Sequence, residues 1–274
     1  MTKIHAIRTG SVQVRHAQMV GKGHGLSRVT NMLTDKDWTE WLPIYAWAIE
    51  RSDGVVVVDT GETTRVHERG YHPEWHPFYR RAVRFKVAPE DELGPQLRAI
   101  GIKAGDIREV ILTHLHTDHA GGLHHVVGAR TRVHAAELRR AQGLMGRLNG
   151  YLPHRWPKWW QPEALHFVDR QIGPFSQSAA ITTDEEILVV PTPGHTPAHV
   201  SVLVQGSPSV FLAGDTSYTQ ALLVEGKVDG VSPDEEISRQ TLSRIRELAS
   251  QRPLVYLPSH DPEAEARLKG NITV

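Results

Sequence analysis

The sequence contains no cysteine, no excess of either charge and no long apolar run. Without cysteine there is no disulfide, no thiolate nucleophile and no zinc site built on sulfur, so any bound metal has to rest on histidine and carboxylate side chains. The 31 Lys and Arg residues balance 31 Asp and Glu residues, which argues against a nucleic-acid partner because phosphate binding needs a clustered cationic excess. No stretch approaches the length of a membrane span and the first residues show no secretory signal, so we expect a cytoplasmic protein.

The distribution of apolar residues over the 274 positions is typical of a globular α/β enzyme. Hydrophobic residues make up 39% of the chain, which is enough material for a core. Short β-branched segments alternate with helical patterns. The expected strands are Ile4–Thr9, Val12–Arg15, Ile44–Ile49, Val55–Val58, Glu109–Leu112, Thr131–Val133, Ile187–Val190, Val200–Val204, Val210–Leu212 and Leu254–Leu257. No internal repeat or linker interrupts this order, so we expect a single domain over residues 1–274.

Three segments do not fit the alternation of strands and helices. We expect His16–Glu40 to form an extended loop. Two aromatic-rich insertions, near 62–90 and 151–175, contain prolines that break regular elements. Their aromatic side chains either line a substrate pocket or form an interface between two copies of the chain, and periodicity does not separate these alternatives. Helices are expected at Ala120–Val127 and His134–Leu148.

An apolar strand, EVILTHLHTDH at 109–119, leads directly into four potential metal ligands. In an extended backbone, residues two apart point the same way, so His114 and His116 address one point. A turn into the following helix then aims Asp118 and His119 at a second point nearby. Four ligands within six residues indicate two metal ions.

Three later strands each end on a further potential ligand. His195 follows a glycine turn in VVPTPGH, Asp215 closes FLAGD, and His260 closes VYLPSH. In α/β folds the ends of the strands face the ligand crevice. We therefore expect these three side chains to join the ligands of the 114–119 motif.

Together these motifs resemble those of the metallo-β-lactamase-fold hydrolases, whose HxHxDH motif matches His114–His119. The resemblance spans most of the chain, through Asp59–Gly61, Pro193–Pro197, Gly214–Asp215 and Ser259–Asp261. It implies an αβ/βα four-layer sandwich, in which two packed mixed sheets are flanked by helices. The fold does not fix the substrate, since this scaffold serves thioesters, lactams, lactones, phosphoesters and RNA.

The resemblance also implies how the ligands are shared between two divalent ions. One ion would be held by His114, His116 and His195, and the other by Asp118, His119 and His260. Asp215 would bridge the two ions. Two ions carry four positive charges, of which two aspartates and a bridging hydroxide neutralise three, leaving one for a developing oxyanion. We expect Zn²⁺, with Fe, Co or Mn as alternatives, because histidine and carboxylate sites accept all of them.

Tyr218, three residues after Asp215, indicates which of these substrate classes the protein acts on. It resembles the tyrosine that N-acyl homoserine lactone lactonases place beside their dinuclear site, where a phenol donates to the substrate oxygen that becomes negative. This predicts a quorum-quenching lactonase in which a metal-bridging hydroxide attacks the lactone carbonyl. Tyr218 would stabilise the oxyanion, and Asp118 would protonate the leaving ring oxygen. Besides the acyl lactone, a second copy of the chain is a candidate partner in a homodimer, whereas nucleic acid and membrane are not expected.

Two other functions compete with the lactonase. One is a different ester-type hydrolase of the same fold, acting on a glutathione thioester, an organophosphate or an aryl ester. The other is a protein that sequesters a signal molecule without cleaving it. Seven ligands with a bridging carboxylate leave room for water, whereas a structural zinc site is closed and four-coordinate, so catalysis is preferred.

Other polar residues near the motifs are expected to support the site or to have no part in it. Asp59 and His199 resemble residues that hold the ligand loops from behind. His124 and His125 follow the motif and are expected to be solvated or packed side chains.

Overall fold

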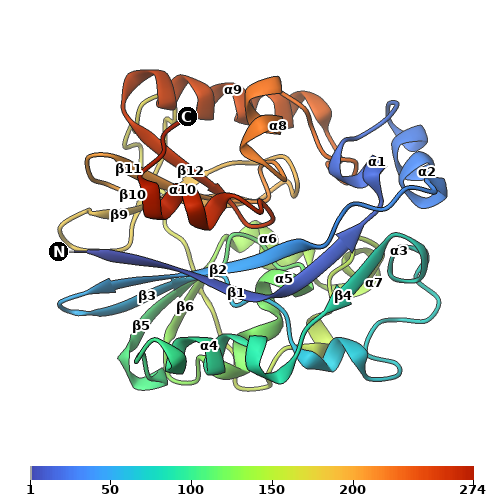
Figure 1. Cartoon of the computed structure of the whole chain (residues 1–274), viewed down its shortest axis with the longest axis horizontal. Coiled ribbons are helices and arrows are strands. Elements are labelled where there is room, and N and C mark those ends of the chain that lie inside the picture. Colours follow the sequence, from blue (N-terminus) through green and yellow to red (C-terminus); the bar gives the residue numbers. More distant parts are fainter. Residues whose placement is uncertain (1) are drawn as a thin grey trace. The chain divides into compact units, whose positions relative to one another are not determined.

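The computed structural model describes residues 2–274, which form two compact units (Figure 1). The first unit comprises the chain up to Val14 together with Glu40–Ala164, and the second comprises Arg15–Thr39 with Leu165–Val274. Each unit contains one mixed β-sheet with helices beside it. The predicted α/β class, with two mixed sheets flanked by helices, is therefore confirmed.

The sheet of the first unit has seven strands in the order β4-β1-β2-β3-β5-β6-β7. Its strands are β1 (Lys3–Val14), β2 (Leu42–Arg51), β3 (Gly54–Val58), β4 (Val83–Lys86), β5 (Ile107–Ile111), β6 (Arg130–Val133) and β7 (Glu163–Ala164). Its α-helices are α3 (Pro77–Arg81), α4 (Leu93–Ala99), α5 (Thr117–Ala120), α6 (Ala135–Arg140) and α7 (Gly143–Leu148). Its 3-10 turns are η1 (Thr64–His67), η2 (Pro89–Asp91), η3 (Ala104–Asp106), η4 (Gly121–His125) and η5 (Pro153–Arg155).

Strand β3 is the middle strand of this sheet, and its valines, Val55–Val58, are all buried. β-Branched side chains suit a strand that is covered on both faces. β3 pairs with β2 in antiparallel and with β5 in parallel orientation. Leu93 and Leu97 of α4 belong to the same apolar core as Ile7 and Val57. Strand β5 ends at Ile111, so the motif begins at the carboxyl edge of the sheet, where α/β folds place their ligands.

The sheet of the second unit has five strands in the order β12-β11-β10-β9-β8, of which only β11 and β12 pair in parallel. Its strands are β8 (Ala179–Ala180), β9 (Ile187–Pro191), β10 (Val200–Val204), β11 (Ser209–Gly214) and β12 (Leu254–Pro258). Its helices are α1 (His16–Met19), α2 (Leu26–Thr34), α8 (Gln220–Glu225), α9 (Glu235–Gln251) and α10 (Ala264–Gly270).

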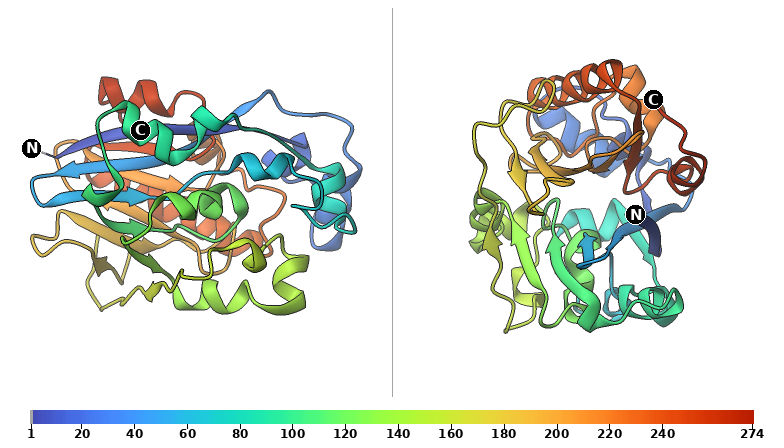
Figure 2. Two further views of the ribbon diagram at one scale, coloured as in Figure 1. Left: turned by 90° about the horizontal axis from the view of Figure 1, so that it is seen from below. Right: turned by 90° about the vertical axis from the view of Figure 1, so that its left-hand side faces the viewer.

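Helix α9 covers a face of this second sheet (Figure 2). It begins where the Asp234 carboxylate accepts two backbone N–H groups, which would otherwise lack an intrahelical partner. Leu242, Ile245 and Leu248 recur at helical spacing and are buried with Phe211 of β11. Across residues 2–274, no helix combines the length and the apolar character needed to cross a membrane.

The amino-terminal expectations were wrong in detail. The two strands predicted before residue 16 are one strand, β1, whose pairing with β2 is irregular between Arg8 and Ser11. Gly10 lies at this irregularity with a φ of 114°, a conformation that glycine adopts without steric cost. The segment His16–Glu40 is not an extended loop, because it contains α1 and α2.

The helices predicted after the motif are shorter than expected. The segment 120–127 is mostly the 3-10 turn η4, and the helix predicted over 134–148 is split into α6 and α7 at Gly143, whose φ is 69°. The insertion 62–90 is less irregular than predicted, because β4 pairs with β1 and Tyr71 is buried. In the insertion 151–175, Tyr151 and Trp160 belong to the core of the first unit, so these two rings fit neither predicted role.

We expect Ile245→Ala in α9 to lower the free energy of unfolding by about 2–5 kcal/mol, because the substitution leaves a cavity in the second core. Ile237→Ala in the same helix is the matched control. Ile237 is 40% exposed whereas Ile245 is fully buried, so the control should change the free energy by less than about 0.5 kcal/mol. Urea unfolding followed by circular dichroism measures both. Equal losses in the two variants would contradict the assigned burial.

Candidate metal centre

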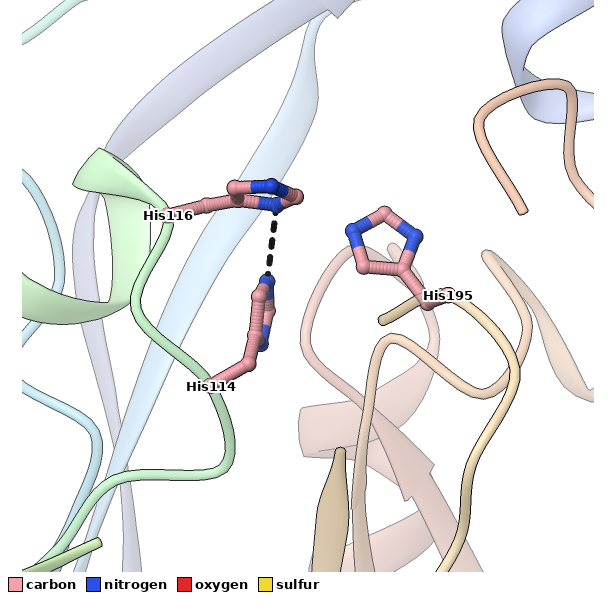
Figure 3. Close-up of side chains that lie close together, drawn as sticks. All are labelled: His114, His116 and His195. Atoms are coloured by element: carbon pink, nitrogen blue, oxygen red, sulfur yellow. Dashed lines mark hydrogen bonds between the residues drawn. The ribbon is translucent and has the colours of Figure 1, made fainter. Parts of the chain in front are cut away.

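In the first unit, the four predicted ligands of the motif lie on the loop after β5 and on α5. His114 and His119 are fully buried, whereas the Asp118 side chain is 16% exposed. The ring of His114 meets that of His116 edge to face, and the nitrogens His114 Nε2 and His116 Nδ1 are 3.1 Å apart (Figure 3). The His114 ring also lies 4.0 Å from the ring of His119. The structure therefore brings the histidines of the motif together.

Asp59, at the end of β3, fixes the orientation of His119. Its Oδ2 accepts a hydrogen bond from His119 Nδ1 at 2.8 Å, and its Oδ1 accepts from the backbone N–H of Thr113 at 2.8 Å. A ring that donates Nδ1–H to a carboxylate presents Nε2 as the ligand atom. Asp59 thus supports the motif from behind and is not itself placed as a ligand.

A backbone carbonyl orients His116 in a similar way. His116 Nε2 donates to the carbonyl oxygen of Asn149 at 3.2 Å, which directs Nδ1 toward His114. His114 Nδ1 lies 3.1 Å from Thr113 Oγ1, so its Nε2 is the nitrogen that faces His116. The two rings thus turn one nitrogen each toward a common point.

In the second unit, the three ligands predicted at strand ends form a group around one carboxylate. His195 follows β9, Asp215 follows β11 and His260 follows β12, and all three are buried. The Nε2 atom of His195 lies 3.4 Å from Asp215 Oδ2, and the Nε2 atom of His260 lies 3.4 Å from Asp215 Oδ1. Each oxygen of Asp215 therefore faces a different imidazole, which is an arrangement suited to a bridging carboxylate.

Asp229 orients His195 and was not identified from the sequence. Its Oδ2 accepts from His195 Nδ1 at 3.0 Å, while its Oδ1 accepts from the backbone N–H groups of Val231 and Ser232. The only local signal was the Asp-Gly pair at 229–230, which marks a turn and gives no partner. The same carboxylate–imidazole support that His119 receives is thus built into the second unit.

His199 and Tyr218 complete the surroundings of this second group. His199 Nε2 accepts from the backbone N–H of Asp215 at 3.0 Å, which fixes the loop that carries the carboxylate. The ring of Tyr218 stacks on that of His260 with centroids 5.5 Å apart. Gln18, from α1, donates its amide to the Tyr218 hydroxyl at 2.9 Å. Sequence reasoning missed Gln18, because nothing local links positions 200 residues apart.

Glu62 is a buried acid near the motif that sequence reasoning also missed. Its side chain is fully buried, and its Oε1 accepts from the backbone N–H of Thr63 at 2.9 Å. Burial, reinforced by the negative charge of Asp118, raises the pKa of Glu62 to about 8. Glu62 is therefore mostly protonated at neutral pH and adds little negative charge beside the motif.

We expect the raised pKa of Glu62 to make the metal-free protein less stable as pH rises from 4.5 to 8. In that window the folded state holds a proton on Glu62 that the unfolded state has lost, so raising the pH favours unfolding. Glu62→Gln should flatten this slope, and Glu68→Gln, at an exposed carboxylate, should not. Urea midpoints across the window measure the effect, and equal slopes in the wild type and Glu62→Gln would refute it.

The sequence is similar to proteins named as hydrolases over most of its length. The family model described as the Metallo-beta-lactamase superfamily matches residues 39–260. An N-acyl homoserine lactonase from a Bacillus species is 28% identical over 251 residues, which cover 89% of this chain and 90% of the relative.

Solved structures agree with the fold. An N-acyl homoserine lactone hydrolase with the product N-hexanoyl-L-homoserine at its catalytic metal centre superposes with a TM-score of 0.76 at 22% identity, covering 96% of this chain and 95% of that structure. A dizinc quorum-quenching lactonase gives a TM-score of 0.66 at 15% identity, with 95% and 88% covered. Because the family model extends over most of the chain, the protein belongs to the metallo-β-lactamase superfamily and is a metal-dependent hydrolase.

Proposed function

We propose that the two ligand groups form one dinuclear metal site within a single metallo-β-lactamase-fold domain over residues 1–274. The family match at 39–260 runs through both units and includes all seven ligands, which supports this assignment. His114, His116 and His195 would hold one ion, and Asp118, His119 and His260 the other. Asp215 would bridge them.

The donor set fits divalent transition metals, and Zn²⁺ is the ion we propose. Imidazole nitrogens and carboxylate oxygens are the usual ligands of zinc when cysteine is absent. His119 and His195 each donate Nδ1–H to a buried carboxylate, which is the support that metal-bound histidines commonly receive. When bound, such ions polarise a carbonyl group and lower the pKa of water.

The proposed reaction is opening of the lactone ring of N-acyl homoserine lactones, which would make the protein a quorum-quenching enzyme. The observation that carries this proposal is the similarity to an N-acyl homoserine lactonase over about nine-tenths of both chains. A solved structure of the same fold with a ring-opened product at its metal centre supports the substrate class.

Hydrolysis of a lactone adds one water, so the acyl carbon gains an oxygen and the ring oxygen leaves as an alcohol that needs a proton. Tyr218 would stabilise the carbonyl oxygen as it becomes negative. The Tyr218 hydroxyl accepts from Gln18, so its own proton is the one that it would donate to the substrate. Asp118 would carry the proton to the ring oxygen.

The structure weakens the case for glutathione thioesters as the substrate. Glutathione carries carboxylates that need basic anchors, and the basic residues near the carboxyl terminus are Arg267 and Lys269. Arg267 is buried and bonds to Asp261, while Lys269 pairs with Glu265 at 2.6 Å. Both cations are thus engaged in ion pairs within α10 and the loop before it.

We expect kcat/KM to be highest for an N-acyl homoserine lactone when it is compared with a glutathione thioester and an aryl phosphotriester. Mass spectrometry should show that the lactone product gains one water. Faster turnover of either other substrate would overturn the proposed substrate, and binding of the lactone without a mass change would indicate a sequestering protein.

We expect Tyr218→Phe to lower kcat by about 100-fold or more while the metal content stays intact, since the substitution removes one donor to the developing oxyanion. Asp215→Asn should instead lower the metal content itself, because an amide replaces the carboxylate between two ligand histidines. Steady-state kinetics and elemental analysis of both variants separate these effects. An unchanged rate in Tyr218→Phe would remove the phenol from the mechanism.

A further inference from the structure

A second group of metal-competent side chains lies in the first unit, outside the ligands already described. Glu92 Oε2 is 3.0 Å from His124 Nε2 and 2.6 Å from His125 Nε2. The two imidazole rings are adjacent in the chain, and their centroids are 3.9 Å apart. Glu92 immediately precedes α4, and both histidines end η4. Two nitrogens and one oxygen thus meet at one point, which the sequence did not predict.

Two threonines hold the Glu92 carboxylate in place. Its Oε1 accepts three hydrogen bonds, from the hydroxyl groups of Thr63 and Thr64 and from the backbone N–H of Thr64. These donors fix the carboxylate plane, so that Oε2 is the oxygen presented to the two histidines. A ligand carboxylate that is itself hydrogen-bonded is the usual construction of a protein metal site.

We propose that Glu92, His124 and His125 bind one divalent transition-metal ion of the zinc class at a site separate from the dinuclear centre. The three residues supply two imidazoles and one carboxylate, and water completes the coordination. This proposal goes beyond the hydrolytic function and does not depend on the number of ions at the other site.

The geometry requires only a small adjustment to admit the ion. Metal–ligand bonds of about 2.0–2.1 Å in a tetrahedron place the ligand atoms about 3.3 Å apart. The contact of His124 with Glu92 would lengthen by about 0.3 Å and that of His125 by about 0.7 Å. Both rings reach the surface, since the side chain of His124 is 43% exposed and that of His125 is 18% exposed. Each ring would present Nε2 to the ion and carry its remaining proton on Nδ1, as the ion replaces the hydrogen bond to Glu92.

The protonation states suit an ion at neutral pH. Burial acts to raise the pKa of Glu92, but hydrogen bonds from Thr64 and His125 outweigh it and hold this pKa at about 2. Burial and the neighbouring His124 lower the pKa of His125. An ionised carboxylate and a neutral imidazole are the forms that bind metals.

The test is a count of bound zinc in the full-length protein. Wild type, Glu92→Gln and His125→Asn are dialysed to equilibrium against Zn²⁺ and analysed by elemental mass spectrometry. His5→Asn is the matched control, because His5 pairs with Glu50 at 3.0 Å as a single histidine beside a carboxylate. We expect one more ion per chain in the wild type and His5→Asn than in Glu92→Gln and His125→Asn.

Two further measurements guard against misfolding of the variants. His124→Asn alters a half-exposed side chain, so loss of the extra ion in that variant is not explained by a lost core. Thr64→Val removes one hydrogen bond to Glu92 and should weaken binding of the extra ion by about tenfold or more. Equal zinc counts in the wild type, Glu92→Gln, His124→Asn and His125→Asn would overturn the proposal.

Discussion

The pairing of a buried carboxylate with the Nδ1–H of a histidine is the interaction on which both ligand groups depend. Asp59 holds His119 in this way in the first unit, and Asp229 holds His195 in the second. A buried carboxylate is costly unless hydrogen bonds satisfy its remaining oxygen. Backbone N–H groups do so in both cases. Thr113 donates to Asp59, and Val231 and Ser232 donate to Asp229. These hydrogen bonds therefore orient one histidine ring in each unit before any ion binds.

Asp59 also carries backbone strain that the surrounding hydrogen bonds sustain. Its φ is 59°, in the left-handed region that non-glycine residues rarely occupy. The N–H of Asp59 nevertheless donates to the carbonyl of Ile111 at 2.8 Å, and the next residue, Thr60, donates its N–H to the carbonyl of His119 at 2.7 Å. The residues that follow β3 are thus hydrogen-bonded to Ile111, before the motif, and to His119, at its end. Such strain persists where the local structure over-determines it, which is typical of functional sites.

Local sequence was sufficient to predict the motif, but not the residues that support it. His114 and His116 were predictable because side chains alternate along an extended segment, and the strand ends at Asp215 and His260 were visible as apolar runs closed by polar residues. The pairing of His195 with Asp229 depends on how the chain returns after α8, which no periodicity encodes. The sequence pattern likewise did not predict that Trp160 lies in the core of the first unit. An aromatic residue between prolines is equally compatible with a surface position and with an interior one.

The contacts of Tyr218 connect the fold to the chemistry proposed for it. A phenol hydroxyl has one proton to donate. The amide of Gln18 donates to the phenol oxygen, so the phenol proton points to an acceptor other than that amide. The stacking on His260 and the hydrogen bond from Gln18 together restrict rotation of the ring and of its hydroxyl group. A donor that is fixed in advance needs no reorganisation when charge develops on the substrate. Helix α1, which carries Gln18, is therefore part of the catalytic apparatus under this proposal, although it lies 200 positions away in the sequence.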